Sequence, residues 1–154
     1  MPGARLGAVA AGAALIEQFV KALDCLHICP QRPAQAALRW AIEALPDWRA
    51  ENRALINGRA AAVRDAFAGL PGWRLDSLGA YFAYVRHPFA GQPAAAIAEL
   101  MAAELGAVCL PGPAFGPGQE RHLRLAFANT DVAGLHALSG RLARLSPAAA
   151  GQRR

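Results

Sequence analysis

Lysine is almost missing from this sequence, because Lys21 is the only lysine among sixteen basic residues. The net charge of +5 therefore comes from arginines, which are scattered along the chain and form no basic run. Proteins that bind nucleic acid gather such charges on one face, and single-strand binders interleave them with aromatic residues. Neither pattern occurs here, so the charge reflects a preference for arginine and we expect no nucleic-acid partner.

Cysteine and long apolar runs are scarce as well. Three cysteines in 154 residues make an odd count without regular spacing, which excludes a secreted disulfide framework and predicts reduced thiols. No apolar run approaches the roughly 20 residues that cross a bilayer. Glu17 interrupts the apolar beginning of the chain, which has no clear cleavage pattern. We therefore expect a cytoplasmic protein with no membrane partner.

Several motifs that hold nucleotides or perform catalysis are absent too. The glycine-rich stretch at 111–118, PGPAFGPG, lacks the Gly-Lys-Ser/Thr ending of a phosphate loop and contains no G-x-G-x-x-G pattern. No carboxylate or serine arrangement near a histidine marks a catalytic triad. We therefore interpret the following histidines as structural or exposed: His87, His122 and His136.

Cys25, His27 and Cys29 form a C-x-H-x-C pattern, which has the residue types of a metal site. On a helix, the two cysteines share one face while His27 points nearly opposite. No fourth ligand lies close in the sequence, although structural zinc sites use four. We therefore predict no metal site.

The apolar residues that are present recur mainly with helical spacing. Leu15, Phe19 and Leu23 belong to one apolar stripe, with Glu17 and Lys21 on the other side. Helix caps are predicted at Asp47, Gly106 and Asp131. The predicted helices span 13–28, 33–45, 48–70, 93–105 and about 132–145.

Extended segments alternate with these helices, so the sequence predicts a mixed α and β fold. The stretch at 80–86 is rich in aromatic and β-branched residues, which favour strands. Residues 5–10 have the character of a short buried strand. Two further strands are predicted at 107–110 and 122–128, on either side of the glycine-rich loop.

Three stretches of the chain resemble class I/II aminotransferases, which are pyridoxal-phosphate (PLP) enzymes of fold type I. MPGARLGAVAA at 1–11 resembles the segment that follows the catalytic lysine of that family. LGAYFAYV at 78–85 is similar to the Gly-Ala-Phe-Tyr strand of its small domain. LPGPAFGPGQERHLRLAFAN at 110–129 closely resembles its Pro-Gly-Ser-x-Phe-Gly loop and the Arg-Leu-Ser-Phe strand behind it. The resemblance covers nearly the whole chain apart from its tail.

The resemblance implies roles for two arginines. Arg124 would pair with the α-carboxylate of the substrate, a task that suits the two parallel donors of a guanidinium. Strand alternation alone would equally place Arg124 on an exposed edge. Arg5, between Gly3 and Gly7, would bind the cofactor phosphate. Phe115 would lie in a loop near the active-site mouth, against the substrate or a partner subunit, or in the core.

The chain also departs from the family, whose catalytic lysine forms a Schiff base with PLP. That lysine precedes the phosphate-binding arginine, whereas Lys21 follows Arg5 and lies on the outer side of a predicted helix. Lys21 is therefore interpreted as a solvated helix residue, and no catalytic residue is assigned. We expect a chain that begins just past the lysine and is inactive alone.

The implied fold is α/β, with a small, mostly antiparallel sheet packed against helices. We expect residues 1–46 to be a remnant of the large PLP-binding domain and 47–145 to form a linking helix and the small domain. Residues 146–154 would be a disordered tail. Because the resemblance implies that most of the large-domain sheet is absent, we expect the chain alone to leave apolar faces of its first strand and helices uncovered. The 55% of hydrophobic residues fits this expectation, although the many alanines could also account for it.

The implied function is the C-terminal part of a PLP-dependent aminotransferase, which transfers an amino group between an amino acid and a 2-oxo acid. The expected partner is a second copy, giving a homodimer, or a complementing large-domain segment. Three alternatives stay open: a PLP-dependent lyase, the aminotransferase-like effector domain of a transcription regulator, and a non-catalytic remnant.

Overall fold

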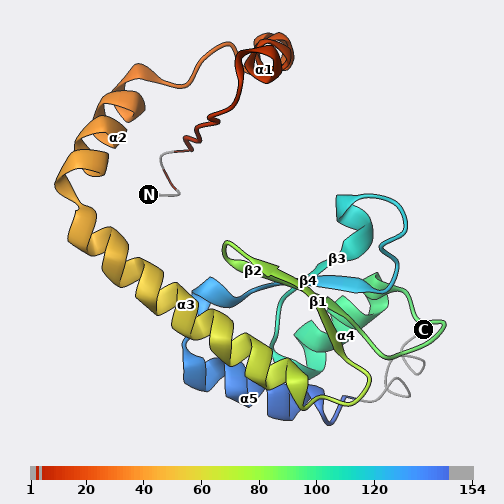
Figure 1. Ribbon diagram of the computed structural model, residues 1–154. Helices are drawn as coiled ribbons and strands as arrows, with labels where there is room; N and C mark the ends of the chain where they lie inside the picture. The colour runs from red at the N-terminus through yellow and green to blue at the C-terminus, as the bar shows by residue number, and fades with distance from the viewer. Residues whose placement is uncertain (1–2, 4, 146–154) are drawn as a thin grey trace. The chain divides into compact units, whose positions relative to one another are not determined.

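The computed structural model of the protein describes residue 3 and residues 5–145. The chain divides into two compact units, Met1–Ala50 and Glu51–Arg154, and the boundary falls inside the longest helix, α3. Figure 1 labels the helices and strands. The disordered tail predicted for 146–154 lies outside the described residues.

The first unit contains α1 (Ala13–Leu26) and α2 (Arg32–Ala44). The strand predicted at 5–10 is wrong, because this segment has no regular secondary structure and Arg5 has a φ of 52°. A strand is stable only when a neighbouring strand satisfies its backbone groups, and no described residue pairs with this one. None of the residues of α1 is buried, so its apolar stripe is uncovered, as predicted.

α1 ends at Leu26, earlier than predicted, and His27 is its C-cap. Cys29 therefore lies beyond the helix, so Cys25 and Cys29 do not share a helical face, contrary to our prediction. Within the described ranges, no three metal-ligating side chains are grouped together.

α3 (Pro46–Ala68) begins one residue before its predicted cap. Asp47 lies in the first turn instead of preceding the helix. Proline is well suited to the first helical position, where its missing N–H has no intrahelical acceptor, and it moves the preceding residue, Leu45, out of helical conformation. The carboxylate of Asp47 near the N-terminus still suits the helix dipole.

The second unit contains a four-stranded sheet in which every pair is antiparallel, with the order β1-β2-β4-β3. The predicted antiparallel sheet is thus confirmed, but the strand predictions need three corrections. The strand predicted at 107–110 begins only at Leu110 and ends at Pro111. β1 was not predicted, because RLDSLG lacks β-branched and aromatic residues. Residues 80 and 81, predicted as strand, form the turn between β1 and β2, where Ala80 has a φ of 49°. The strands span Arg74–Gly79, Phe82–Arg86, Leu110–Pro111 and His122–Ala126.

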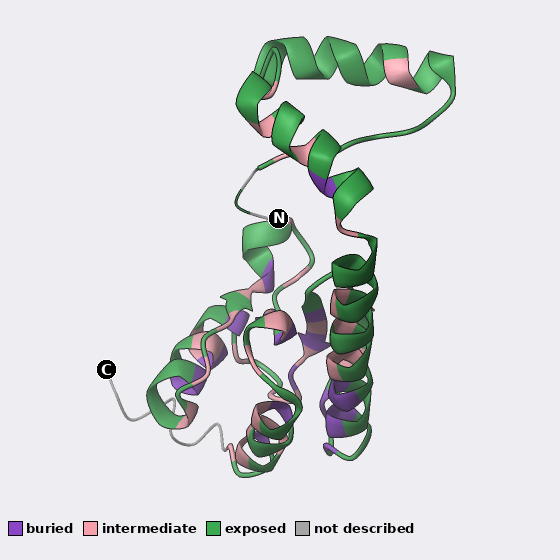
Figure 2. Cartoon of the chain, turned by 90° about the vertical axis from the view of Figure 1, so that its left-hand side faces the viewer, coloured by how far each residue is buried: buried purple, intermediate pink, exposed green. Residues whose placement is uncertain are grey.

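Helices α3, α4 (Ala94–Leu105) and α5 (Val132–Leu142) supply the residues that pack on one face of this sheet. Buried residues of the second unit gather between these helices and the strands (Figure 2). Two cap predictions are confirmed. Gly106 ends α4 with a left-handed φ of 59°, and the Asp131 side chain accepts a hydrogen bond from the Gly134 N–H at the start of α5. The sheet contributes Ala83, Val85, Leu123 and Leu125 to the core.

The core also contains a titratable side chain, His87, which is fully buried. Its ring stacks on Phe89 at 5.9 Å between centroids, and neither ring nitrogen has a hydrogen-bond partner within the described residues. Burial lowers the pKa of His87 to about 4, and the positive charge of Arg121 and the neighbouring His122 act in the same direction. The imidazole is therefore neutral in the folded protein.

We expect this histidine to make the fold sensitive to acid. The unfolded chain binds a proton on His87 at about pH 6.5 and the folded chain only near pH 4, so stability falls as the pH drops through this window. Over the whole window the loss should be about 3 kcal/mol. Urea unfolding of His87→Phe, measured at several pH values, should lack this component. His136→Gln, which alters an exposed histidine of α5, should retain it; identical pH profiles for all three proteins would contradict the prediction.

Candidate functional site

The face of the sheet opposite the helices carries polar and aromatic side chains of strands β2 and β4. Side chains of a strand point alternately to the two faces, and the buried positions of β2 and β4 alternate with partly exposed ones. We call this surface the open sheet face. It consists of Phe82, Tyr84 and Arg86 of β2 and His122, Arg124 and Ala126 of β4.

Arg124 lies at the centre of the open sheet face, paired across the ladder with Tyr84 on β2 and Leu110 on β3. Its guanidinium carbon is 4.3 Å from the ring centroid of Phe82 and 4.3 Å from that of Phe115. Two aromatic rings therefore hold the guanidinium by cation–π contact. Within residues 5–145, no hydrogen bond or ion pair of the Arg124 side chain is found. Its donors are available to a ligand.

The glycine-rich loop brings Phe115 to this position. A short 3-10 helix, Gly112–Phe115, follows β3 directly and presents the ring. Phe115 remains partly exposed, so it is not a core residue. The Tyr84 hydroxyl donates a hydrogen bond of 3.0 Å to Gln119 Oε1, and the Tyr84 and Phe115 rings meet edge to face. The loop is thus tied to the sheet beside Arg124.

A cluster of charged side chains adjoins Arg124 on the same face. Asp76 of β1 accepts a hydrogen bond from Arg74 and lies 3.5 Å from Arg86 Nε. His122 Nε2 is 2.9 Å from Asp76 Oδ2. A carboxylate can only accept, so Nε2 carries the proton. The His122 ring also stacks on Tyr84, at 4.9 Å between centroids and 5° between planes.

Sequence reasoning missed the Asp76–His122 pair. The two residues are 46 positions apart, and strand pairing through β2 brings them together. The sequence interpretation of His122 as structural or exposed is compatible with this ion pair, but it did not identify Asp76 as the partner. Because β1 was not recognised as a strand, the sequence held no signal that would have placed Asp76 on this face.

Asp76 should contribute to stability through its charge. The hydrogen bond from Arg74 lowers the pKa of Asp76 to about 2, His122 and the charge of Arg86 add to this, and partial desolvation opposes it. Its contribution is therefore present above about pH 4 and is lost as the pH falls through 2. After allowance for solvent screening, Asp76→Asn should cost about 1 kcal/mol at pH 7.

The measurement is chemical unfolding of Asp76→Asn at pH 7 and near pH 2, in low and high salt. The difference from the parent protein should shrink in acid and in salt. Asp65→Asn, which alters an exposed carboxyl on α3, is the control. A cost that is the same under all these conditions would show that the charge of Asp76 is not responsible.

The other predicted site residues lie in the first unit. Arg5 is exposed and precedes α1 in a segment without regular structure. Lys21 Nζ lies 3.1 Å from Glu17 Oε1, one helical turn away, and its side chain is 62% exposed. Lys21 is thus a solvated helix residue, as the sequence indicates. No helix among the described residues has the length and apolar character that crossing a membrane requires.

Comparison with known proteins gives a consistent result. The family model of class I and II aminotransferases matches residues 1–142. The aspartate aminotransferase of Pyrococcus abyssi is 33% identical over 132 residues, which are 83% of this chain and 33% of that protein. This chain therefore spans about a third of the length of that curated relative.

Solved structures agree with the sequence comparison. The aromatic aminotransferase of Pyrococcus horikoshii is 31% identical with a TM-score of 0.69, over 94% of this chain and 39% of that one. The α-aminoadipate aminotransferase of Thermus thermophilus, solved with N-(5'-phosphopyridoxyl)-L-leucine, has a TM-score of 0.70 over 93% of this chain and 38% of that one. At 24% identity, the latter shows the shared fold alone. The match over residues 1–142 shows that this chain belongs to the class I and II aminotransferase family.

Proposed function

We propose that this chain is the C-terminal part of a PLP-dependent aminotransferase and that Arg124 binds the carboxylate of its amino-acid and 2-oxo-acid substrates. The observation that supports this is the set of contacts that the Arg124 guanidinium makes. This guanidinium is held between two aromatic rings, yet no acidic side chain among the described residues neutralises it. A positioned cation with free donors suits a carboxylate.

The surroundings of Arg124 favour a planar anion over a bulky one. The rings of Phe82 and Phe115 restrict rotation of the guanidinium, so the edge that carries its parallel N–H groups keeps one direction. A carboxylate that pairs with that edge is fixed in orientation as well as in position. The neighbouring Asp76 is engaged by Arg74, Arg86 and His122, which reduces its repulsion of an incoming anion.

PLP supplies an electron sink that lets an amino group move between carbon skeletons. The described residues do not build a site for it by themselves, because Arg5 is exposed and Lys21 is ion-paired on α1. We therefore derive no step through the cofactor. Our proposal for Arg5 is limited to contact with the cofactor phosphate, once another polypeptide segment completes the site.

We also propose that the first unit belongs to the cofactor-binding domain and is covered by a second copy of the chain or by a complementing large-domain segment. In support, α1 buries none of its residues although Leu15, Phe19 and Leu23 form an apolar stripe along it. Such a stripe favours association. Light scattering of the purified chain, with and without that segment, tests this.

Carboxylate binding can be tested on the chain as it stands. Titration with pyruvate, followed by NMR of the arginine and aromatic side chains, should shift the resonances of Arg124 and Phe115. Pyruvamide has nearly the same shape and no charge, and should not shift them. Equal effects of the two compounds, or shifts elsewhere only, would contradict the role of Arg124.

Activity requires a separate test. We expect the purified chain, with PLP, an amino acid and a 2-oxo acid, to show no transamination above a blank with PLP alone. Addition of a segment that carries the family's lysine should restore turnover. Activity of the chain alone that disappears in Lys21→Arg would contradict this proposal.

A further inference from the structure

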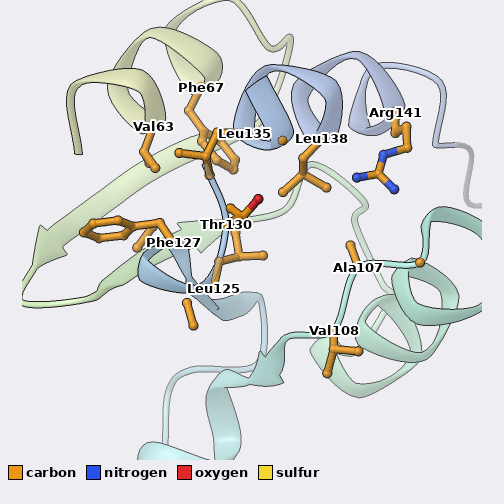
Figure 3. A pocket seen from close by; sticks show the side chains of 14 residues that line it. Val63, Phe67, Ala107, Val108, Leu125, Phe127, Thr130, Leu135, Leu138 and Arg141 are labelled. Atoms are coloured by element: carbon orange, nitrogen blue, oxygen red, sulfur yellow. The ribbon is translucent and has the colours of Figure 1, made fainter. Parts of the chain in front are cut away.

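A cavity of about 180 Å³ lies on the core side of the sheet, away from Arg124. Leu125, which lines it, is next to Arg124 in β4 and points to the opposite face. Figure 3 shows the lining side chains, which come from α3, α5, the end of β4 and the segment after α4. Most are apolar, among them Val63, Phe67, Leu125, Phe127, Leu135 and Leu138.

Two polar side chains interrupt this apolar lining. Arg141 of α5 and Thr130 contribute a guanidinium and a hydroxyl (Figure 3). The Nη1 of Arg141 donates a hydrogen bond to the Leu105 carbonyl oxygen, but its Nε is buried and has no partner within residues 5–145. No acidic residue lines the cavity. The cavity therefore combines apolar walls with one positive charge.

Size and charge together limit what this cavity can bind. An apolar cavity of roughly 150 Å³ holds one benzene molecule, so this one suits a ligand of about eight non-hydrogen atoms. Because the Arg141 guanidinium lines the cavity and no acidic residue does, an anion that accepts from this guanidinium is stabilised more than a neutral guest. Such a ligand needs an apolar chain for the walls and an anionic end for Arg141.

We propose that this cavity is a second binding site, for a short-chain aliphatic monocarboxylate. The hydrocarbon chain lies among Leu125, Leu135 and Leu138, and the carboxylate accepts from the Arg141 guanidinium and the Thr130 hydroxyl. Arg141 and Leu125 lie on the core side of the sheet and Arg124 on the other, so the site does not depend on the proposed role of Arg124. For a ligand this small, a Kd on the order of 1 mM is expected.

The test uses sodium hexanoate and 1-hexanol as probes of the methyl-labelled chain by NMR. Hexanoate should shift the methyl resonances of Leu125, Leu135 and Leu138. Arg141→Gln should weaken hexanoate about tenfold, the range of one charge-assisted hydrogen bond, and leave hexanol unchanged. Arg144→Gln removes the same charge from an exposed neighbour and should leave hexanoate binding unchanged.

Two further variants keep the outcome decisive. Ala107→Leu fills the cavity and leaves Arg141 in place, so it should abolish the leucine shifts for both probes even if Arg141→Gln does not fold. Arg124→Gln should leave those shifts unaltered. Hexanoate shifts confined to Arg124 and Phe115 would refute the second site while supporting the proposed substrate site. Equal binding of hexanoate by Arg141→Gln and the parent chain would show that Arg141 does not hold the carboxylate.

Discussion

Arg124→Gln is expected to lower the affinity of the chain for pyruvate by about 100-fold, which corresponds to about 2.7 kcal/mol. Glutamine keeps a polar side chain on β4 but loses the charge and the pair of parallel donors. It also loses the cation that Phe82 and Phe115 hold. NMR titration of the free chain gives the affinity, and kcat/KM of a complemented enzyme gives the same loss in the reaction.

The choice of variants separates charge from geometry. Arg124→Lys keeps the charge but provides a point donor in place of a fork, so we expect intermediate binding. Arg64→Gln, which alters an exposed arginine of α3, tests the effect of net charge alone. Loss of affinity in Arg64→Gln equal to that in Arg124→Gln would reduce the role of Arg124 to long-range attraction.

The sequence predicted best the elements that carry their own boundary signals. α4 ends at Gly106 and α5 begins at Asp131, as predicted, because a left-handed cap and a side-chain cap depend on local residues only. β2 and β4 were placed nearly correctly for a similar reason. Their aromatic and aliphatic residues favour strands wherever they occur.

Elements that depend on distant partners were predicted less well. β1 has a weak intrinsic strand preference and is formed because β2 pairs with it along most of its length. Residues 5–10 have the stronger strand character but no pairing partner within the described chain. Propensity alone therefore ranked these two segments in the wrong order.

In the candidate site, too, features that depend on local residues were predicted better than features that depend on distant strands. Arg124 could be singled out from its motif, whereas the sequence left Phe115 open between the active-site mouth and the core. The contact of Phe82 with Arg124 required the register of β2 against β4. The ion pairs of Asp76 required a strand that the sequence did not reveal. Side chains supplied by neighbouring strands are therefore the part of the site that sequence reasoning missed.

Gly112→Ala is expected to have the largest effect on the loop that covers Arg124. A Cβ atom at this position would overlap the Gln119 carbonyl oxygen and lie 2.9 Å from the Cβ atoms of Gln119 and His122. All three obstacles are backbone atoms or Cβ atoms, whose positions the backbone fixes, so no rotamer change relieves them. We expect a loss of about 3–4 kcal/mol in unfolding free energy.

The same substitution should also weaken carboxylate binding. Gly112 begins the short helix that presents Phe115. Gly112 also lies against Gln119, whose side chain accepts the hydrogen bond from Tyr84. Urea unfolding measures the loss of stability. Pyruvate titration at low temperature, where the variant stays folded, measures the loss of carboxylate binding. Gly58→Ala is the matched control, since a Cβ there meets no atom within 4 Å and alanine favours the helix by about 1 kcal/mol. If Gly112→Ala were as stable as the parent chain, the close approach of residues 112 and 119 would be wrong, and with it the placement of Phe115 over Arg124.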